Sequence, residues 1–386
     1  MKYIKEFLLF SYIFVIYFYY IIEYSFLILH GIGLLFSLVM IYDVLLRKEK
    51  IKINFFLVLF FINILWFVIS YFWSIDQEEA FSIVRILISI FIFSFFLYNH
   101  INETQKAERI LAYFGINTLL ITIYALVTFE YIHFGLRRFD SAGNPNYISI
   151  LVFIGLIISF YFVLQKKQYY YAIILPVGLL YIFLAGSRKV MIGLILVIFL
   201  FALLNYNFKK VFKRTIISIL LIIIAYQLLA NVEILQPTYD RMNQFINSIS
   251  GGDVTDGSLT TRNTMINRGI EYIGEKPFIG HGVGQYRFIF EKETGTEIYS
   301  HNNFVEIGVN NGLIGLIFYY SMFFYIFLQF YYFNLVRDEL SKVLLIIVIS
   351  IFIFGYGEVQ YYSYPYYILL IIATKVFYLK RQRIVD

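Results

Sequence analysis

The stretch Tyr299–Phe333, "YSHNNFVEIGVNNGLIGLIFYYSMFFYIFLQFYYF", joins a polar segment to a long aromatic one. From Leu316 onward it carries no charged residue, and together with the apolar residues just before it this run is long enough to cross a bilayer, which takes about 20 residues. A histidine, a glutamate and four asparagines stand at its beginning. Because polar groups are costly in hydrocarbon, the stretch predicts a membrane helix that starts at a functional site.

The rest of the chain has the composition of a membrane protein. Of its 386 residues, 60% are hydrophobic and only 15% are charged, against about 25% charged in a soluble domain. The predicted fold class is therefore an all-α polytopic membrane protein. The N-terminal apolar stretch lacks a small-residue cleavage site, so we expect a retained first helix. The absence of cysteine excludes disulfides and thiolate metal sites.

Apolar segments of about 20 residues give the expected topology. Twelve such spans are expected, the tenth too long for one perpendicular crossing: 4–22, 25–45, 53–73, 80–98, 110–130, 147–164, 169–185, 190–206, 215–231, 303–333, 342–356 and 364–379. The predicted organisation is nine transmembrane helices in residues 1–231, a large extracytoplasmic loop at 232–302, and three helices with a short tail in 303–386.

Lysine and arginine prefer cytoplasmic loops, and this preference sets the expected orientation. Seven basic clusters fall on one side of the twelve-span topology: Lys2/Lys5, Arg47/Lys48/Lys50/Lys52, Lys106/Arg109, Lys166/Lys167, Lys209/Lys210/Lys213/Arg214, Arg337/Lys342 and Lys380/Arg381/Arg383. Both termini are then expected in the cytoplasm.

Four basic residues oppose this rule and fall in short outer loops: Arg137, Arg138, Arg188 and Lys189. They are either interface anchors or parts of a site. Arg188 follows Gly-Ser at the start of a helix, where backbone N–H groups and a guanidinium together make a seat for an anion. We therefore favour a phosphate ester or diphosphate site at Arg188.

The large loop contributes "TTRNTMINRGIEYIGEKPFIGHGVGQYRF", residues 260–288. A helix is expected from Thr260 to Gly274, ended by Pro277 and followed by glycines that let the chain turn close to a neighbour. Arg262 and Arg268 lie on this helix and are candidate anion ligands. The alternative interpretation is a solvated amphipathic helix followed by an ordinary glycine turn.

In the opening stretch, Asn302, Glu306 and Asn310 fall on one helix face at about 100° per residue. Glycines on the opposite side allow close helix packing, so we expect the polar face to line a cavity. His301 stands at its lip and is the best candidate general base, because its intrinsic pKa is near neutral. His281, inside the glycine turn, is its rival and is interpreted as structural.

Two further charged residues complete the candidates. Arg85 lies inside the fourth span, where a buried cation indicates a partner or an anionic ligand, and Glu358 is a suggested partner. The sequence "GDVTDG" at 252–257 is interpreted as a turn rather than a cation loop.

Four elements in order resemble the O-antigen ligase and Wzy-type polysaccharide polymerase superfamily. They are "SAGNPNY", "GSRK", a long loop with "EKPFIGHGVGQYRF", and "SHNNFVEIGVNNGLIGLIFYY", and the resemblance covers residues 140–320. It implies a bacterial plasma-membrane glycosyltransferase with a GT-C-like helical fold and no metal or cofactor. It also implies that Arg188 and Arg262, or Arg268 instead, bind the donor diphosphate beside a catalytic His301.

The same resemblance implies the partners, and the residues considered above suggest the cavity. The donor and acceptor are expected to be undecaprenyl-diphosphate-linked oligosaccharides, with a chain-length regulator and a flippase as further partners and no nucleic acid. Arg137, Arg138, Asn144, Asn302, Glu306 and Arg85 are candidates for the substrate cavity on the extracytoplasmic face.

Three functions remain open from the sequence. A polymerase joins repeat units into O-antigen, capsule or exopolysaccharide, whereas a ligase transfers the finished glycan to lipid A core, and the motifs do not distinguish the two. We favour the polymerase because the composition suits a low-GC Gram-positive organism. The third hypothesis, a flippase for lipid-linked sugars, would place basic residues along a central cavity through many spans.

Overall fold

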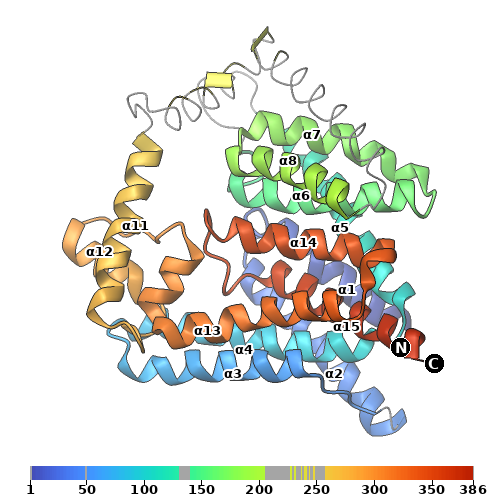
Figure 1. The fold of residues 1–386 in the computed structure, drawn as a ribbon, viewed down its shortest axis with the longest axis horizontal. Helices are drawn as coiled ribbons and strands as arrows, with labels where there is room; N and C mark the ends of the chain where they lie inside the picture. Colours follow the sequence, from blue (N-terminus) through green and yellow to red (C-terminus); the bar gives the residue numbers. More distant parts are fainter. Residues whose placement is uncertain are drawn as a thin grey trace.

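The computed structural model describes residues 2–47, 50–129, 140–204 and 257–385, with a few single positions between 227 and 247 (Figure 1). Helices form the described part, which contains no strand. They are α1 (Lys2–Tyr17), α2 (Ser25–Arg47), α3 (Phe55–Ser70), α4 (Gln77–His100), α5 (Thr104–Thr128), α6 (Pro145–Leu164), α7 (Ile174–Ala185), α8 (Arg188–Leu203), α11 (Gly257–Glu275), α12 (Gln285–Thr294), α13 (Asn303–Tyr332), α14 (Glu339–Phe354) and α15 (Tyr364–Val385).

Helices occur at eleven of the twelve expected spans, and the remaining one, the ninth at 215–231, lies outside the fully described ranges. Six of these helices are long and apolar enough to cross a membrane: α2, α4, α5, α6, α13, and α3 with the single turn that follows it. Others are shorter, since α1, α8 and α14 have 16 residues each, which is about 24 Å of helix. The protein is therefore a helical polytopic membrane protein, and the count of twelve spans and the GT-C-like fold stay predictions.

Helix α13 is bent where a continuous helix was expected. Gly312 has φ 67° and ψ −168°, a non-helical conformation inside the element. The residues from Val305 to Gly312 are buried, and exposed apolar side chains begin at Leu313. The excess length of this segment is therefore explained by a buried first part and a membrane-facing second part that meet at Gly312.

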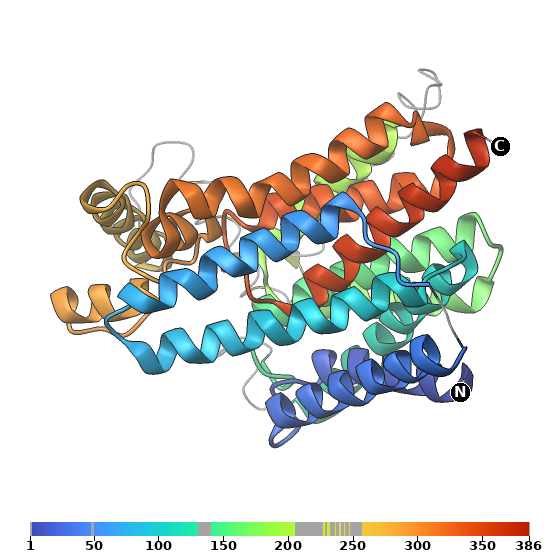
Figure 2. The ribbon, with the colours of Figure 1, turned by 90° about the horizontal axis from the view of Figure 1, so that it is seen from below.

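The two ends of the bundle differ in charge. Ion pairs join several of the predicted cytoplasmic clusters to acidic partners: Lys5 to Asp43, Arg109 to Glu6, Lys166 to Glu108 and Lys380 to Asp338. Both termini lie at this end, and α11 and α12 lie at the other (Figures 1 and 2). The basic clusters among the described residues thus gather at one end, as expected, while their assignment to the cytoplasm stays a prediction.

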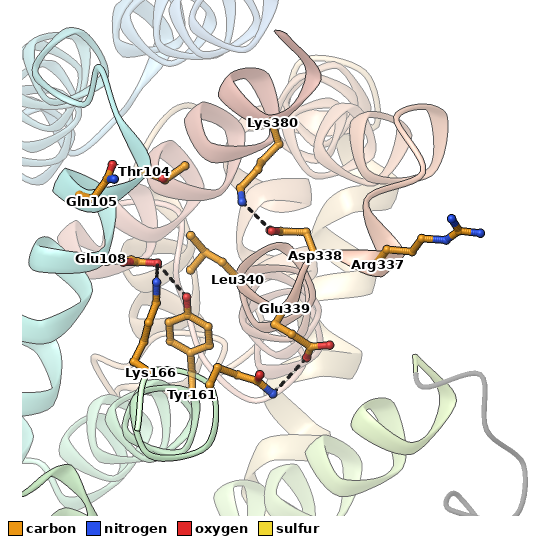
Figure 3. Close-up of a pocket in the computed structure, with 11 residues that line it drawn as sticks. Thr104, Gln105, Glu108, Tyr161, Lys166, Arg337, Asp338, Glu339, Leu340 and Lys380 are labelled. Carbon is orange, nitrogen blue, oxygen red and sulfur yellow. Dashed lines mark hydrogen bonds and ion pairs between the residues drawn. The ribbon is translucent and has the colours of Figure 1, made fainter. Parts of the chain in front are cut away.

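A polar pocket of about 490 Å³ opens at the end that carries the termini (Figure 3). Its walls come from the start of α5, the end of α6, the turn before α14 and Lys380 of α15. Two of its lysines are paired within it, Lys166 with Glu108 at 2.6 Å and Lys380 with Asp338 at 2.6 Å. Helix α6 begins at the opposite end, about 30 Å away for its 20 residues, so this pocket is separate from the candidate site below.

Helices α11 and α12 cap the other end through a second, smaller core. Met265, Tyr272, Tyr286, Phe290, Val305 and Val309 form this cluster. Gly269 and Gly308 allow the close approach of α11 to α13. An added methyl group would lie 2.1 Å from Val305 at Gly269 and 2.6 Å from Ile273 at Gly308. The expected loop helix is confirmed, and its apolar face is packed on α13 rather than fully solvated.

Candidate active site

The turn between α7 and α8 places Arg188 and Lys189 at the end of the bundle opposite the termini. Gly186 ends α7 with φ 59°, and Arg188 is the first residue of α8. The Ser187 hydroxyl does not cap α8 but donates to Asn146 Oδ1 at 3.3 Å. Asn144 caps α6 by accepting from two backbone N–H groups. The "GNPN" and "GSR" motifs are therefore in contact, and Asn144 has a structural role there.

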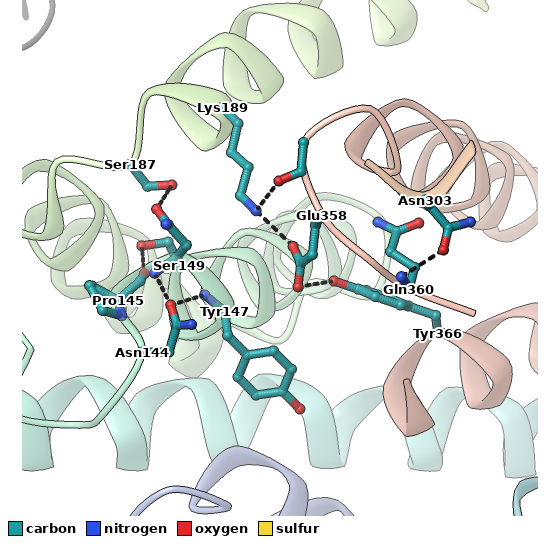
Figure 4. Close-up of polar contacts among 12 residues, drawn as sticks. Asn144, Pro145, Tyr147, Ser149, Ser187, Lys189, Asn303, Glu358, Gln360 and Tyr366 are labelled. Carbon is teal, nitrogen blue, oxygen red and sulfur yellow. Dashed lines mark hydrogen bonds and ion pairs between the residues drawn. The ribbon is translucent and has the colours of Figure 1, made fainter. Parts of the chain in front are cut away.

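Lys189 forms an ion pair with Glu358 (Figure 4). The Nζ···Oε2 distance is 2.8 Å, and the two side chains are only 19% and 15% exposed. The second oxygen of Glu358 accepts from the Tyr366 hydroxyl at 3.4 Å. Glu358 is therefore paired with Lys189, and the suggested pairing of Glu358 with Arg85 is wrong.

The start of α13 fixes the loop that carries Glu358. Asn303 Oδ1 accepts from the backbone N–H groups of Gln360 and Tyr361 at 2.7 and 2.9 Å, and its own N–H donates to Gly355 O at 2.7 Å. Asn303 is 1% exposed. Because every one of these bonds is buried, the asparagine of the "HNN" motif couples the histidine segment to the Glu358 loop.

His301 lies immediately before α13 in a left-handed conformation, with φ 55°. Such a conformation is uncommon outside glycine and is found at sites where the surroundings hold it in place. Its ring lies against Tyr299, with centroids 4.1 Å apart, and the Arg287 guanidinium lies over the Tyr299 ring at 5.5 Å. His301 is thus fixed at the junction of the α12–α13 loop and α13.

The charges around His301 favour the neutral imidazole. Burial, together with the positive charges of Arg262 and Lys189, lowers the pKa of His301 from 6.5 to about 4. Burial and the Glu358 carboxylate raise the pKa of the neighbouring Tyr299, against which Arg262 and Arg287 act. The charges of Arg262 and Lys189 therefore both act on His301, although the three residues lie on separate elements.

The two loop arginines point to different surroundings. Arg262 is half-buried and its charge acts on His301. Arg268 is exposed and pairs with Glu271 at 2.8 Å and Glu293 at 3.1 Å. Six residues of α-helix rotate a side chain by about 240°, so the two arginines cannot share a face.

This arrangement has a counterpart among known families. A family model described as O-antigen ligase, Wzy_C, matches residues 171–320. The match supports a likeness of residues 171–320 to the O-antigen ligase and Wzy superfamily. Members of this family are glycosyltransferase-like enzymes that act on lipid-linked oligosaccharides in membranes. The comparison with curated proteins found no match.

The matched segment, residues 171–320, contains Arg188, Lys189, Arg262 and His301, and it ends before Glu358. The polar face of α13 that was expected to line a cavity also lies within this segment. Among the described residues, other parts of the protein cover it, so it lines no cavity there. Asn302, Glu306 and Asn310 are 3%, 4% and 0% exposed. Asn302 caps α13, Glu306 accepts from the Ser300 N–H at 2.9 Å, and Asn310 accepts from the Tyr286 N–H at 2.8 Å. These side chains hold the site together.

The remaining candidates have other contacts or lie outside the described residues. The Arg85 guanidinium stacks on Phe26 at 4.7 Å. His281 is 6% exposed and its ring contacts Tyr272 O at 2.9 Å, which confirms its structural interpretation. Arg137, Arg138 and most of the "GDVTDG" turn lie outside the described residues.

Sequence reasoning did not assign roles to three residues of the site. The sequence distinguishes Lys189 only by its position against the topology rule, suggests Arg85 as the partner of Glu358, and carries no signal for Arg287. The spacing of these residues in the chain carries no signal of their contacts, because Lys189 and Glu358 are 169 positions apart. Among the described residues, no group of three or more His, Asp or Glu side chains could hold a metal ion.

Proposed function

We propose that the protein is a metal-independent membrane glycosyltransferase that polymerises polyprenyl-diphosphate-linked oligosaccharide repeat units into a surface polysaccharide. The observation that carries the proposal is that His301 is partly buried and lies near enough to Arg262 and Lys189 for both positive charges to lower its pKa and keep the ring neutral. A base flanked by fixed positive charges suits a reaction in which an anionic group leaves as a hydroxyl attacks. The match of residues 171–320 to the O-antigen ligase family supports the same class of chemistry.

In the proposed reaction the bond between the anomeric carbon of the donor sugar and the diphosphate oxygen breaks. Its electron pair leaves with the diphosphate, whose added charge is stabilised by the guanidinium groups of Arg188 and Arg262. The acceptor hydroxyl oxygen forms the new bond to the anomeric carbon, and its proton passes to His301. Lys189, held by Glu358, is proposed as a third cation beside the diphosphate.

Donor binding is proposed to prepare the base. A pKa of about 4 makes His301 a weak base in the free protein. A diphosphate beside Arg262 and Lys189 offsets the charges that lower this pKa, so the histidine becomes more basic when the donor is present. The site would then accept a proton only when a leaving group is in place.

The orientation is part of the proposal. We propose that the termini and the polar pocket face the cytoplasm of a bacterium and that α11, α12 and His301 face outward, with the soluble segment 232–302 on that side. Lipid-linked oligosaccharides serve as donor and acceptor, and a chain-length regulator and a flippase act with the protein. The description of the matched family as O-antigen ligase favours one alternative, transfer of the glycan to lipid A core.

The function is tested by complementing a deletion strain with wild type or His301→Ala, each at matched membrane expression, and separating surface and lipid-linked glycans on gels. We expect wild type to give a ladder and His301→Ala to give single repeat units. Long lipid-linked chains that accumulate unattached would identify a ligase instead. Repeat units that accumulate on the cytoplasmic side of the membrane would identify a flippase, and an unchanged ladder would contradict the role of His301.

The pH dependence of the reaction tests the charge arrangement. A histidine with a lowered pKa stays neutral until the pH falls through that value, so kcat/KM of wild type is expected to fall only near pH 4. Lys189→Met removes one positive charge and should move this acid limb upward, towards 6.5, whatever its effect on the maximal rate. The measurement is kcat/KM against pH for both proteins in detergent, and equal midpoints would contradict the assignment.

A further inference from the structure

The turn that follows α11 exposes two large apolar side chains in a segment expected to be soluble. Phe278 and Ile279 are 65% and 45% exposed, and Lys276 and Pro277 beside them are also exposed. The chain ahead of this turn, helix α11, packs its apolar face onto α13. Two adjacent exposed apolar residues of this size on a turn outside the candidate membrane spans require an explanation.

Main-chain hydrogen bonds hold the turn against the bend of α13. The Leu313 N–H donates to Pro277 O at 2.8 Å, and the Ile314 N–H donates to Phe278 O at 3.2 Å. Leu313 and Ile317, at 48% and 56% exposed, are the first large apolar residues of this candidate span with substantial exposure. The turn therefore lies at the level where α13 begins to face lipid.

The end of α3 reaches the same level from the other side. Ser74 packs against Gly282, at which an added methyl group would lie 2.3 Å from the serine hydroxyl. Phe72 and Ile75, on either side of this contact, are 78% and 62% exposed. The exposed apolar side chains of the turn thus lie beside the exposed apolar side chains of two candidate spans, α3 and α13.

Both tryptophans of the chain lie here. Trp66 and Trp73 have ring centroids 5.8 Å apart, and Trp66 Nε1 donates to Asn311 O at 3.0 Å, directly before the bend. Tryptophan is enriched where a bilayer meets water, because one part of the ring prefers hydrocarbon and the N–H prefers a polar partner. The position of both rings beside the bend agrees with a membrane interface at this level.

We propose that the turn Pro277–Gly280 is inserted into the interfacial region of the bilayer, where lipid covers Phe278 and Ile279. Lipid is the occupant because the surface continues the membrane-facing sides of α3 and α13, and because exposed Lys276 lies where it can contact headgroup phosphates. The turn would anchor the C-terminal end of α11, the helix that positions Arg262. This inference holds whether or not the proposed reaction is correct.

Because the chain has no cysteine, a single introduced thiol reports its own surroundings. Phe278→Cys, labelled with an environment-sensitive fluorophore, would be reconstituted in nanodiscs of phosphatidylcholine and phosphatidylglycerol. Quenching by lipids that carry a nitroxide near the headgroup is compared with quenching by aqueous iodide. The lipid-exposed control is Ile317→Cys on α13, and the water-exposed control is Glu291→Cys on α12.

We expect the Phe278 label to follow the Ile317 label, with several-fold stronger quenching by the nitroxide lipid than the Glu291 label shows. Strong iodide quenching at position 278, equal to that at 291, would overturn the proposal. Protection from both quenchers that grows with protein density in the bilayer would also overturn it, because a second copy of the chain would then be the occupant. Ile279→Cys provides a second reporter if Phe278→Cys does not fold.

Discussion

Arg262→Ala is expected to lower the rate of glycosyl transfer by about 100- to 1,000-fold, whereas Arg268→Ala leaves it near that of wild type. The half-buried Arg262 acts on His301, so its loss removes a fixed positive charge from the proposed leaving group. Arg268 is paired with Glu271 and Glu293 on an exposed surface, where solvent screens ion pairs and they contribute little to stability. The measurement is transfer from a labelled lipid-linked donor by purified protein.

The two substitutions are well matched, because both remove an arginine from the same helix. Equal thermal unfolding of the two variants would show that the activity difference is not caused by loss of folding. Arg262→Lys should recover part of the activity, because it restores the charge without the planar guanidinium. Equal losses of activity in Arg262→Ala and Arg268→Ala, or no loss in the former, would contradict the proposed site.

The second large effect is expected from Gly312→Ala, which should destabilise the folded protein by roughly 3–5 kcal/mol. Gly312 combines a positive φ with an extended ψ, a conformation open almost only to glycine. An added methyl group would also lie 2.3 Å from the carbonyl carbon and oxygen of Phe278. These are backbone atoms, so they cannot rotate away, and either the bend of α13 or the turn after α11 must shift.

The control is Gly274→Ala near the end of α11, where an added methyl group meets nothing within 4 Å. Alanine favours helix over glycine by about 1 kcal/mol, so this variant should be neutral or slightly more stable. Thermal unfolding in detergent, followed by the loss of monodisperse protein, measures both. A melting temperature of Gly312→Ala close to that of wild type would show that the bend tolerates a side chain and that its geometry is not required.

The positions of the helices could be predicted from local composition. A run of apolar residues in hydrocarbon can satisfy the hydrogen bonds of its backbone within the segment only as a helix. Eleven expected spans therefore coincide with helices. The loop helix carrying Arg262 could be predicted from the residues up to Pro277, and the structural role of His281 from its place in a glycine turn. The bend at Gly312 could not, because its conformation depends on the turn that packs against it.

The polar face of α13 shows the limit of periodicity. A helical wheel correctly groups Asn302, Glu306 and Asn310, but it does not tell whether solvent or protein covers them. In the structure, Ser300, directly before α13, supplies the partner of Glu306, whereas Tyr286 and Tyr361, the partners of Asn310, come from other parts of the chain. A polar stripe at a membrane helix start can therefore be a structural junction as well as a cavity wall.

The sequence by itself determined that the protein is a helical membrane protein, that its candidate site residues are Arg188, His301 and one of Arg262 and Arg268, and that basic clusters gather at one end. Each of these follows from residue type and from near neighbours in the chain. Only the tertiary structure decided which loop arginine lies beside His301, that Lys189 joins them, and that Glu358 holds Lys189. Those contacts join residues far apart in sequence, and their geometry comes from helix packing, which no local pattern specifies.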